Sequence, residues 1–255
     1  MRFEGTDPFD GVTRVVFAHA HPDDETLATG ALIQHLVRSG PAVAVVTATR
    51  GERGEVVPGS GAPPAGTEAL HAHRMDELAT ALRALGAEGP YLLGEPPARA
   101  AGWPPRRYAD SGMRWVTPTV AGPGEDAGPD AFTSAPTVEA SADLAAFLAG
   151  WRADLVVSYQ ADGGYGHPDH VRMHHVARQA AERAGVPFAE VISIPRDGTE
   201  PDSDGVTWYD LDDRLAELLP ALAAHASQYT VDGTDVVHSG GQREPIQLRT
   251  GVRRC

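Results

Sequence analysis

Residues 15–25 read Val15-Val16-Phe17-Ala18-His19-Ala20-His21-Pro22-Asp23-Asp24-Glu25. The apolar, β-branched first part is typical of a buried strand. The proline suits a turn or a first helical position, where its missing N–H costs nothing, and apolar residues at helical spacing follow between residues 28 and 37. The polar cluster therefore marks the point where a strand ends and a helix begins, which is where open α/β sheets bind ligands.

Two side chains of this cluster have the spacing of half a metal site. His21 and Asp24 lie three residues apart across the expected turn, so they can converge on one point. An imidazole with a carboxylate is a common pair of ligands for zinc or another divalent ion. Carboxylates at a helix start can also favour the helix dipole and cap free N–H groups. From this cluster alone both interpretations stay open.

A second cluster of the same kind occurs 140 to 150 residues further along the chain. The segment Tyr165-Gly166-His167-Pro168-Asp169-His170 also follows a strand-like run, residues 154–159, and also opens a helical stretch. Two His-Pro-Asp turns, each placed after a buried strand, are hard to explain by helix capping alone. The repetition favours a metal site to which both turns contribute.

The two turns together resemble the PIG-L/LmbE-like zinc deacetylases. The resemblance is closest to the mycothiol-pathway branch, which acts on an N-acetylglucosaminyl inositol. It covers most of the chain and includes four further segments: Gly51 to Val56, Arg74, Ala109 to Met113, and Leu222 to Gln228. It implies a hydrolase that removes the N-acetyl group from an N-acetylglucosamine-type glycoside or conjugate.

The resemblance also implies a metal centre and a general base. The ligands would be His21, Asp24 and His170, with Zn²⁺ as the ion and another divalent metal such as Fe²⁺ as the alternative. Zinc lowers the pKa of bound water towards ~7, which makes a hydroxide equivalent available at neutral pH. Asp23 would take the proton of that water.

The remaining roles follow from the same resemblance. Tyr165 would donate to the oxyanion, and His167, if protonated, would stabilise it and protonate the leaving amine. Asp169 would orient a histidine. Read from the residues alone, a glutamate in the Gly/Pro-rich loop 50–66 is a solvated charge and an arginine on the next helix is a surface cation. The family resemblance instead implies that Glu55, Arg74 and Asp110 contact the sugar of the substrate.

The composition excludes several classes of protein. With 21 basic against 35 acidic residues, the net charge of −14 argues against nucleic acid or an anionic membrane surface as a partner. All 21 of these basic residues are arginines. Because the chain has no lysine, a Schiff-base mechanism and a Walker-type phosphate-binding lysine are excluded. The one cysteine, Cys255, allows neither an internal disulfide nor a thiolate zinc site.

The chain shows no targeting or membrane segment. Residues 1–11 are acidic and lack an apolar signal region, and no window approaches the ~20 apolar residues of a membrane span. We therefore expect a cytoplasmic enzyme whose partner is a small amino-sugar substrate, and we leave a homo-oligomer open.

Alternation of strands and helices predicts one Rossmann-like α/β domain, residues 1–255, with a mostly parallel sheet and helices on both faces. A dinucleotide is not expected, because no Gly-x-Gly-x-x-Gly follows the first strand. Residues 95–136 form a long, lid-like loop, and the chain after residue 228 is turn-rich. Further strands are expected at 42–49, 91–94, 154–159, 189–195 and 205–211, and further helices at 67–85, 137–151, 171–184 and 212–227.

Three hypotheses on function remain. The leading one is the metal-dependent deacetylase. The second is an amidase that cleaves a mycothiol-like thiol conjugate, although that branch typically carries a lysine shortly after the first motif and residues 26–30 have none. The third is a catalytically weak, metal-dependent sugar-binding protein, which would have no need of a general base.

Overall fold

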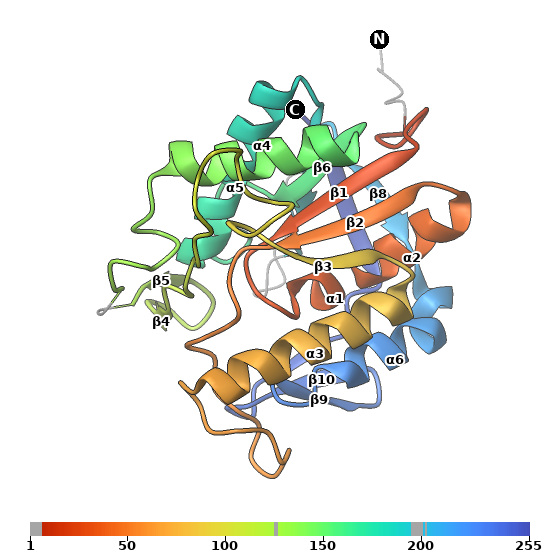
Figure 1. Ribbon diagram of the computed structural model, residues 1–255. Helices are drawn as coiled ribbons and strands as arrows, with labels where there is room; N and C mark the ends of the chain where they lie inside the picture. The colour runs from red at the N-terminus through yellow and green to blue at the C-terminus, as the bar shows by residue number, and fades with distance from the viewer. Residues whose placement is uncertain (1–6, 125–126, 195–200, 202) are drawn as a thin grey trace.

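The computed structural model describes residues 7–124, 127–194, 201 and 203–255. Its centre is a seven-stranded sheet of order β3-β2-β1-β6-β7-β12-β8, with helices on both faces (Figure 1). This confirms the predicted α/β fold with a mostly parallel sheet. The strands are β1 Arg14–His19, β2 Ala42–Thr47, β3 Glu88–Leu92, β6 Leu155–Tyr159, β7 Phe188–Ile192, β8 Thr207–Asp210 and β12 Arg249–Arg254.

The helices expected at 67–85, 137–151, 171–184 and 212–227 are present, with shifts of at most three residues at their ends and with η1 forming the start of the last. Helices α2, α3 and α6 pack on one face of the sheet, and α4 and α5 pack on the other (Figure 1). No helix in the described part of the chain has both the length and the apolar character needed to cross a bilayer. The bounds are α1 Asp24–Leu27, α2 Gly30–Ser39, α3 Glu68–Leu85, α4 Thr137–Trp151, α5 Pro168–Ala184, η1 Asp212–Arg214 and α6 Leu215–Ala224.

The chain forms two helices after the first turn. The helix expected from the apolar residues between 28 and 37 is α2, and the short α1 precedes it, with a break between them at residues 28 and 29. Thr29 lies at the break, where its hydroxyl donates to the Glu25 carbonyl oxygen at 2.9 Å and contacts His19 Nε2 at 3.0 Å. A side chain that bonds to a carbonyl four residues earlier competes with the helical backbone, so Thr29 separates the two helices.

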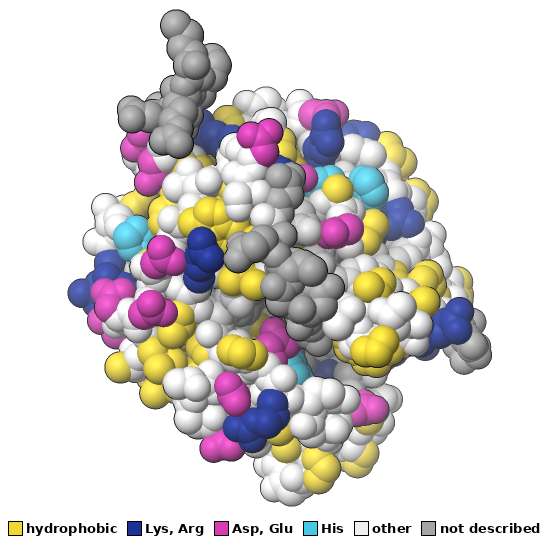
Figure 2. Space-filling model, turned by 180° about the vertical axis from the view of Figure 1, so that it is seen from behind, with side chains coloured by type: hydrophobic (Ala, Val, Ile, Leu, Met, Phe, Trp, Pro, Cys, Tyr) yellow, Lys and Arg dark blue, Asp and Glu magenta, His cyan; other side chains and the backbone are white. Residues whose placement is uncertain are grey.

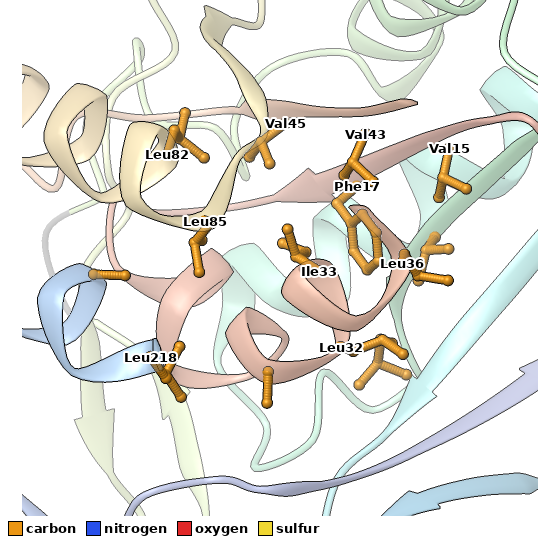
Figure 3. Packing of buried hydrophobic residues seen from close by; sticks show 14 of the residues in the cluster. Val15, Phe17, Leu32, Ile33, Leu36, Val43, Val45, Leu82, Leu85 and Leu218 are labelled. Carbon is orange, nitrogen blue, oxygen red and sulfur yellow. The ribbon is translucent and has the colours of Figure 1, made fainter. Parts of the chain in front are cut away.

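Successive residues of β1 point to opposite faces of the sheet. Val15 and Phe17 pack with residues of α2, α3 and α6 (Figure 3), whereas Val16 and Ala18 pack with residues of α4 and α5. All four side chains are fully buried. A strand that is covered on both faces needs a continuous apolar run, as parallel sheets in α/β proteins have.

The site is positioned by a reversal of strand order at β1. This strand pairs in parallel with β2 on one side and with β6 on the other, while the chain runs from β1 to β2 and β3 before it returns to β6. The carboxyl ends of β1 and β6 therefore flank the topological switch point, where sheets of this type bind ligands. The two His-Pro-Asp turns leave the sheet at this edge.

The chain after residue 228 differs from the sequence expectation. It contains β12, which pairs antiparallel between β7 and β8, and a small separate sheet of β9 Tyr229–Asp232, β10 Asp235–His238 and β11 Arg243–Pro245. The β12 pattern was missed because arginines surround its buried centre. Arg249 pairs with Asp210 at 3.2 Å and Arg253 with Glu190 at 3.0 Å. The neighbouring β7 ends at Ile192, and Pro195 of the expected strand lies outside the described residues.

The connector between β3 and α4 is attached to the body of the protein by a buried carboxylate. It contains the hairpin of β4 Met113–Trp115 and β5 Ala121–Pro123. Asp143 on α4 is completely buried. It accepts hydrogen bonds from Arg99 Nη1 at 2.6 Å, Ala100 N at 2.9 Å and Tyr108 Oη at 2.8 Å. Much of the segment is therefore ordered by polar contacts that helical or strand periodicity does not reveal.

We expect Asp143→Ala to lower the free energy of unfolding by about 3–5 kcal/mol, because the Tyr108 hydroxyl and the Ala100 N–H lose their acceptor and Arg99 loses the nearer of its two carboxylate partners, Asp143 and Glu139. Equilibrium denaturation in urea measures this loss. Tyr108→Phe is the matched comparison, since it removes a single hydrogen bond to the carboxylate and should cost about 1.5 kcal/mol. Equal losses in the two variants would contradict the anchoring role of Asp143.

Candidate active site

Asp24 is fixed between the ends of β1 and β6. Its Oδ2 accepts hydrogen bonds from the His21 backbone N–H at 2.8 Å and from the Tyr159 hydroxyl at 2.6 Å. The same hydroxyl accepts the Ala20 N–H at 2.8 Å, so the end of β6 holds the first turn in place. Although burial alone would raise it, His170 and His21 hold the pKa of Asp24 well below its ordinary value. The carboxylate is therefore ionised.

His170 brings the second turn to the same point. Its Nε2 lies 3.3 Å from His21 Nδ1 and 3.3 Å from Asp24 Oδ1, and His21 Nδ1 lies 3.2 Å from Asp24 Oδ2. A tetrahedral zinc site with bonds of ~2.0 Å has ligand-to-ligand distances of about 3.3 Å. Because His170 Nδ1 faces the Gly163 carbonyl oxygen at 3.2 Å, its proton belongs there and Nε2 keeps a free lone pair. The donor atoms and their spacing fit a bound divalent cation, and His167 is near enough to His21 and His170 to join them as a ligand.

His21 is oriented from its other side by two carboxylates. Its Nε2 lies 3.2 Å from Asp169 Oδ2 and 3.8 Å from Asp110 Oδ1. Asp169 is itself fixed by the N–H and hydroxyl of Ser111. Despite burial, Asp169 and Asp24 raise the pKa of His21 well above its ordinary value. A histidine that binds a metal through one ring nitrogen commonly hydrogen-bonds a carboxylate through the other, which fixes the orientation of the ring. The negative charge of these carboxylates also favours a cation at this point.

Asp23 lies between the two residues of the first turn and has an unusual backbone. Its φ is +133°, a region that residues with a side chain rarely adopt. Its side chain lines the cavity. Burial, and next the negative charge of Asp24, raise the pKa of Asp23 to about 7. A carboxyl group that titrates near neutral pH is suited to proton transfer.

The second turn also presents Tyr165 and His167 to the cavity. The ring centroids of His167 and His21 are 4.5 Å apart, and those of Tyr165 and His170 are 5.2 Å apart. Burial, together with His21 and His170, lowers the pKa of His167. The imidazole is therefore neutral at rest, and the expected proton-donor role requires that it first gains a proton during the reaction.

The residues of the two turns that line a common cavity of about 1280 Å³ are His21, Asp23, Asp24, Tyr165, His167 and His170. The surface of Figure 2 shows acidic and histidine side chains in a hollow. The cavity is also lined by the three residues expected at the sugar. Asp110 is buried and Glu55 is exposed, and the Glu55 carboxylate accepts a hydrogen bond from Ser239 Oγ at 3.1 Å.

Arg74 is not the surface cation that the residue type alone indicated. It is 1 % exposed and donates to the carbonyl oxygens of Gly51, Gly54 and Glu55. A Cβ atom on Gly54 would lie 2.5 Å from Arg74 Nη1, so glycine is needed for this close approach. Arg74 therefore holds the loop that follows β2 as well as lining the cavity.

A comparison with protein-family models now identifies the chain. Residues 16–181, which include both His-Pro-Asp turns, match the PIG-L family model, described as GlcNAc-PI de-N-acetylase. The chain belongs to the PIG-L family. The family resemblance seen in the sequence is thereby confirmed.

A relative of this PIG-L protein agrees with that assignment, and solved structures share its fold. It is 38% identical over 249 residues to a 1D-myo-inositol 2-acetamido-2-deoxy-alpha-D-glucopyranoside deacetylase of a Mycobacterium species, covering 86% of this chain and 75% of that one. Among solved structures it resembles the N,N'-diacetylchitobiose deacetylase of Pyrococcus horikoshii, with 21% identity, a TM-score of 0.60, and 89% and 75% of the two chains covered. A deacetylase of teicoplanin biosynthesis matches with 20% identity, a TM-score of 0.61, and 95% and 99% covered.

Sequence reasoning left three residues of this PIG-L site without a role. Tyr159 is the last residue of β6, and its hydroxyl donates a hydrogen bond to Asp24. Its position at the end of a strand is the sequence signal that could have assigned it to the site. Glu25 ends the first motif and His225 lies in a segment included in the resemblance, yet their side chains meet at 2.8 Å. Neither position carried a pattern that predicted this contact.

Proposed function

We propose that this PIG-L protein is a zinc-dependent deacetylase that hydrolyses the acetamide of an N-acetylglucosamine-type glycoside. The observation that carries the proposal is the convergence of His21, Asp24 and His170 at 3.2–3.3 Å, with the Asp23 carboxyl group beside them in a large cavity. A protein that only bound sugar would not need a carboxyl group with a raised pKa at this place.

His21, Asp24 and His170 would hold the metal ion. Two imidazoles with one carboxylate suit zinc better than magnesium or calcium, which prefer oxygen ligands. When bound, zinc lowers the pKa of a water molecule and polarises a carbonyl group. Asp169 would keep the His21 ring in the orientation that presents Nδ1 to the ion.

The other side chains of the site would handle protons and charge. Asp23 would accept the proton of the attacking water. The hydroxyl of Tyr165 would donate a hydrogen bond to the carbonyl oxygen as negative charge develops on it. His167, neutral at rest, would receive the proton that Asp23 has taken from the water and pass it to the amine that leaves.

The cavity suits a substrate rich in hydroxyl groups. Asp110 and Glu55 would accept hydrogen bonds from sugar hydroxyls, and Arg74 would support the loop that carries Glu55. The chain after residue 227 lines the cavity with mostly uncharged hydrogen-bonding side chains, and the cavity volume exceeds the roughly 300–1,000 Å³ of common ligand pockets. An amino sugar with a polar group attached would fill it. The lining residues from this part of the chain are Gln228, His238, Ser239, Gln242, Glu244, Gln247 and Thr250.

We expect the purified enzyme to release acetate from a small N-acetylglucosaminide and to cleave bulky acyl-cysteinyl conjugates of glucosamine more slowly. The reason is that buried hydroxyl-binding groups left unpaired cost ~1–3 kcal/mol each. The test compares kcat/KM for both compounds under identical conditions. A clear preference for the conjugate would assign the protein to the amidases and would leave the metal site unchanged.

A further inference from the structure

The peptide that joins Pro22 to Asp23 is held at both of its polar atoms by side chains. The Pro22 carbonyl oxygen accepts a hydrogen bond from Gln228 Nε2 at 2.5 Å. The Asp23 N–H donates to Glu25 Oε2 at 2.9 Å. This peptide sets the φ of +133° at Asp23, a conformation that costs of order 1–3 kcal/mol unless its surroundings fix it. Rotating the peptide to relieve the strain would break both hydrogen bonds.

His225 connects the two side chains that hold the peptide. Its Nε2 lies 2.8 Å from Glu25 Oε1, and its Nδ1 lies 3.2 Å from Gln228 Nε2. The amide nitrogen of Gln228 has two hydrogens, so it can donate to Nδ1 and to the Pro22 carbonyl oxygen together. This arrangement assigns the His225 proton to Nε2, where it is donated to Glu25. The three side chains form one unbroken chain of hydrogen bonds.

The chain of hydrogen bonds is anchored outside the active site. Ser227, which follows α6, donates its backbone N–H and its hydroxyl to the two carboxylate oxygens of Glu77 on α3, at 2.7 and 2.6 Å. Both Ser227 and His225 are completely buried. The segment 225–228 is thus fixed to α3 on one side and to the Asp23 turn on the other.

We infer that Glu25, His225 and Gln228 are positioning residues for Asp23, an inference that rests on the proposed function. The Asp23 side chain lines the cavity, whereas those of Glu25 and His225 are 0 % exposed and are not among the described residues that line it. They therefore act on the reaction through the backbone of the turn. The segment from Leu222 to Gln228, which is part of the family resemblance, thereby has a role in holding the Asp23 turn.

His225→Gln tests the inference with a residue that cannot touch the substrate. We expect kcat to fall by about 10- to 100-fold, because a displacement of 1 Å at a reacting group can cost about 10²-fold. The KM for the N-acetylglucosaminide should change less than about threefold, and metal content should stay near one ion per chain. Glu25→Gln, which keeps the side-chain length and weakens the acceptor of the Asp23 N–H, serves as a second variant if the first folds poorly, because Glu25 is also fully buried and does not line the cavity. If His225→Gln instead lost its metal and added zinc restored kcat, then His225 would support the metal site rather than Asp23, and the inference would be overturned.

A double-mutant cycle separates positioning from a general loss of structure. If His225 acts only through Asp23, then His225→Gln in an Asp23→Asn background should change kcat by less than about twofold. If the fold-losses in kcat of the two single variants multiplied in the double variant, the two residues would act independently and the inference would be refuted. Leu148→Ala is the control for stability, since it removes a fully buried core side chain on α4 that does not line the cavity and should lower the urea midpoint without changing kcat.

Hydrogen exchange gives a readout that does not depend on activity. In His225→Gln the amides of residues 23–25 should exchange faster than in Leu148→Ala, because the bond from the Asp23 N–H to Glu25 is loosened. If these amides were as well protected from exchange in His225→Gln as in the wild-type protein, the inference would be refuted. A wild-type enzyme that releases no acetate from any N-acetylglucosaminide would instead refute the proposed function, so the two failures are distinguishable.

Discussion

Replacing His170 by alanine will remove the metal and the activity together. His170 Nε2 lies at one corner of the cluster with His21 and Asp24, and a site that keeps only two protein ligands no longer closes around zinc. A metal in such a hydrolase stabilises the transition state by several kcal/mol. At 1.4 kcal/mol per factor of ten, kcat/KM should fall by about 10³-fold or more.

Elemental analysis and acetate release, measured on the same preparation, check this result. Wild-type protein should carry about one zinc ion per chain after gentle purification, and His170→Ala should carry almost none. His175→Ala is the control, because His175 lies on the same helix and is exposed. Full activity of metal-free wild-type protein in a chelator would contradict a metal mechanism.

The sequence was most informative where function depends on short segments at the ends of strands. The continuous apolar, β-branched runs within residues 15–19 and 154–159 identify buried strands, and parallel strands bring their carboxyl ends to one edge. Two local turns, 140 to 150 residues apart, were therefore predicted to meet. The spacing of His21 and Asp24 within one turn needs no knowledge of the rest of the fold.

Contacts between distant elements could not be predicted in the same way. Glu25 and His225 are 200 residues apart, and no periodicity relates a motif after β1 to the residue that follows α6. Arg74 has the spacing of an ordinary helix residue, and only the path of the loop after β2 buries its guanidinium group against carbonyl oxygens. Side chains that support the site from outside are therefore the part that sequence patterns reveal least.

Asp23→Asn will separate proton transfer from metal binding. The amide has the same shape, and the backbone of the turn is held by Glu25 through the Asp23 N–H rather than through the Asp23 side chain. The metal should therefore stay near one ion per chain. Because an amide cannot accept the proton of water at neutral pH, kcat should fall by about 10²–10⁴-fold, the usual contribution of a general base. Metal analysis and steady-state kinetics on one preparation measure both quantities.

Asp24→Asn is the matched variant, since it makes the same chemical change one residue further along the chain. Asp24 Oδ1 and Oδ2 face His170 Nε2 and His21 Nδ1 at 3.3 and 3.2 Å, so an amide nitrogen there would weaken the metal site itself. Asp24→Asn should lose metal in proportion to activity, and added zinc should restore part of both. If Asp23→Asn emptied the site while Asp24→Asn kept its metal, the roles of the two aspartates would be reversed. The raised pKa of Asp23, caused by burial and by the charge of Asp24, argues for the assignment made here.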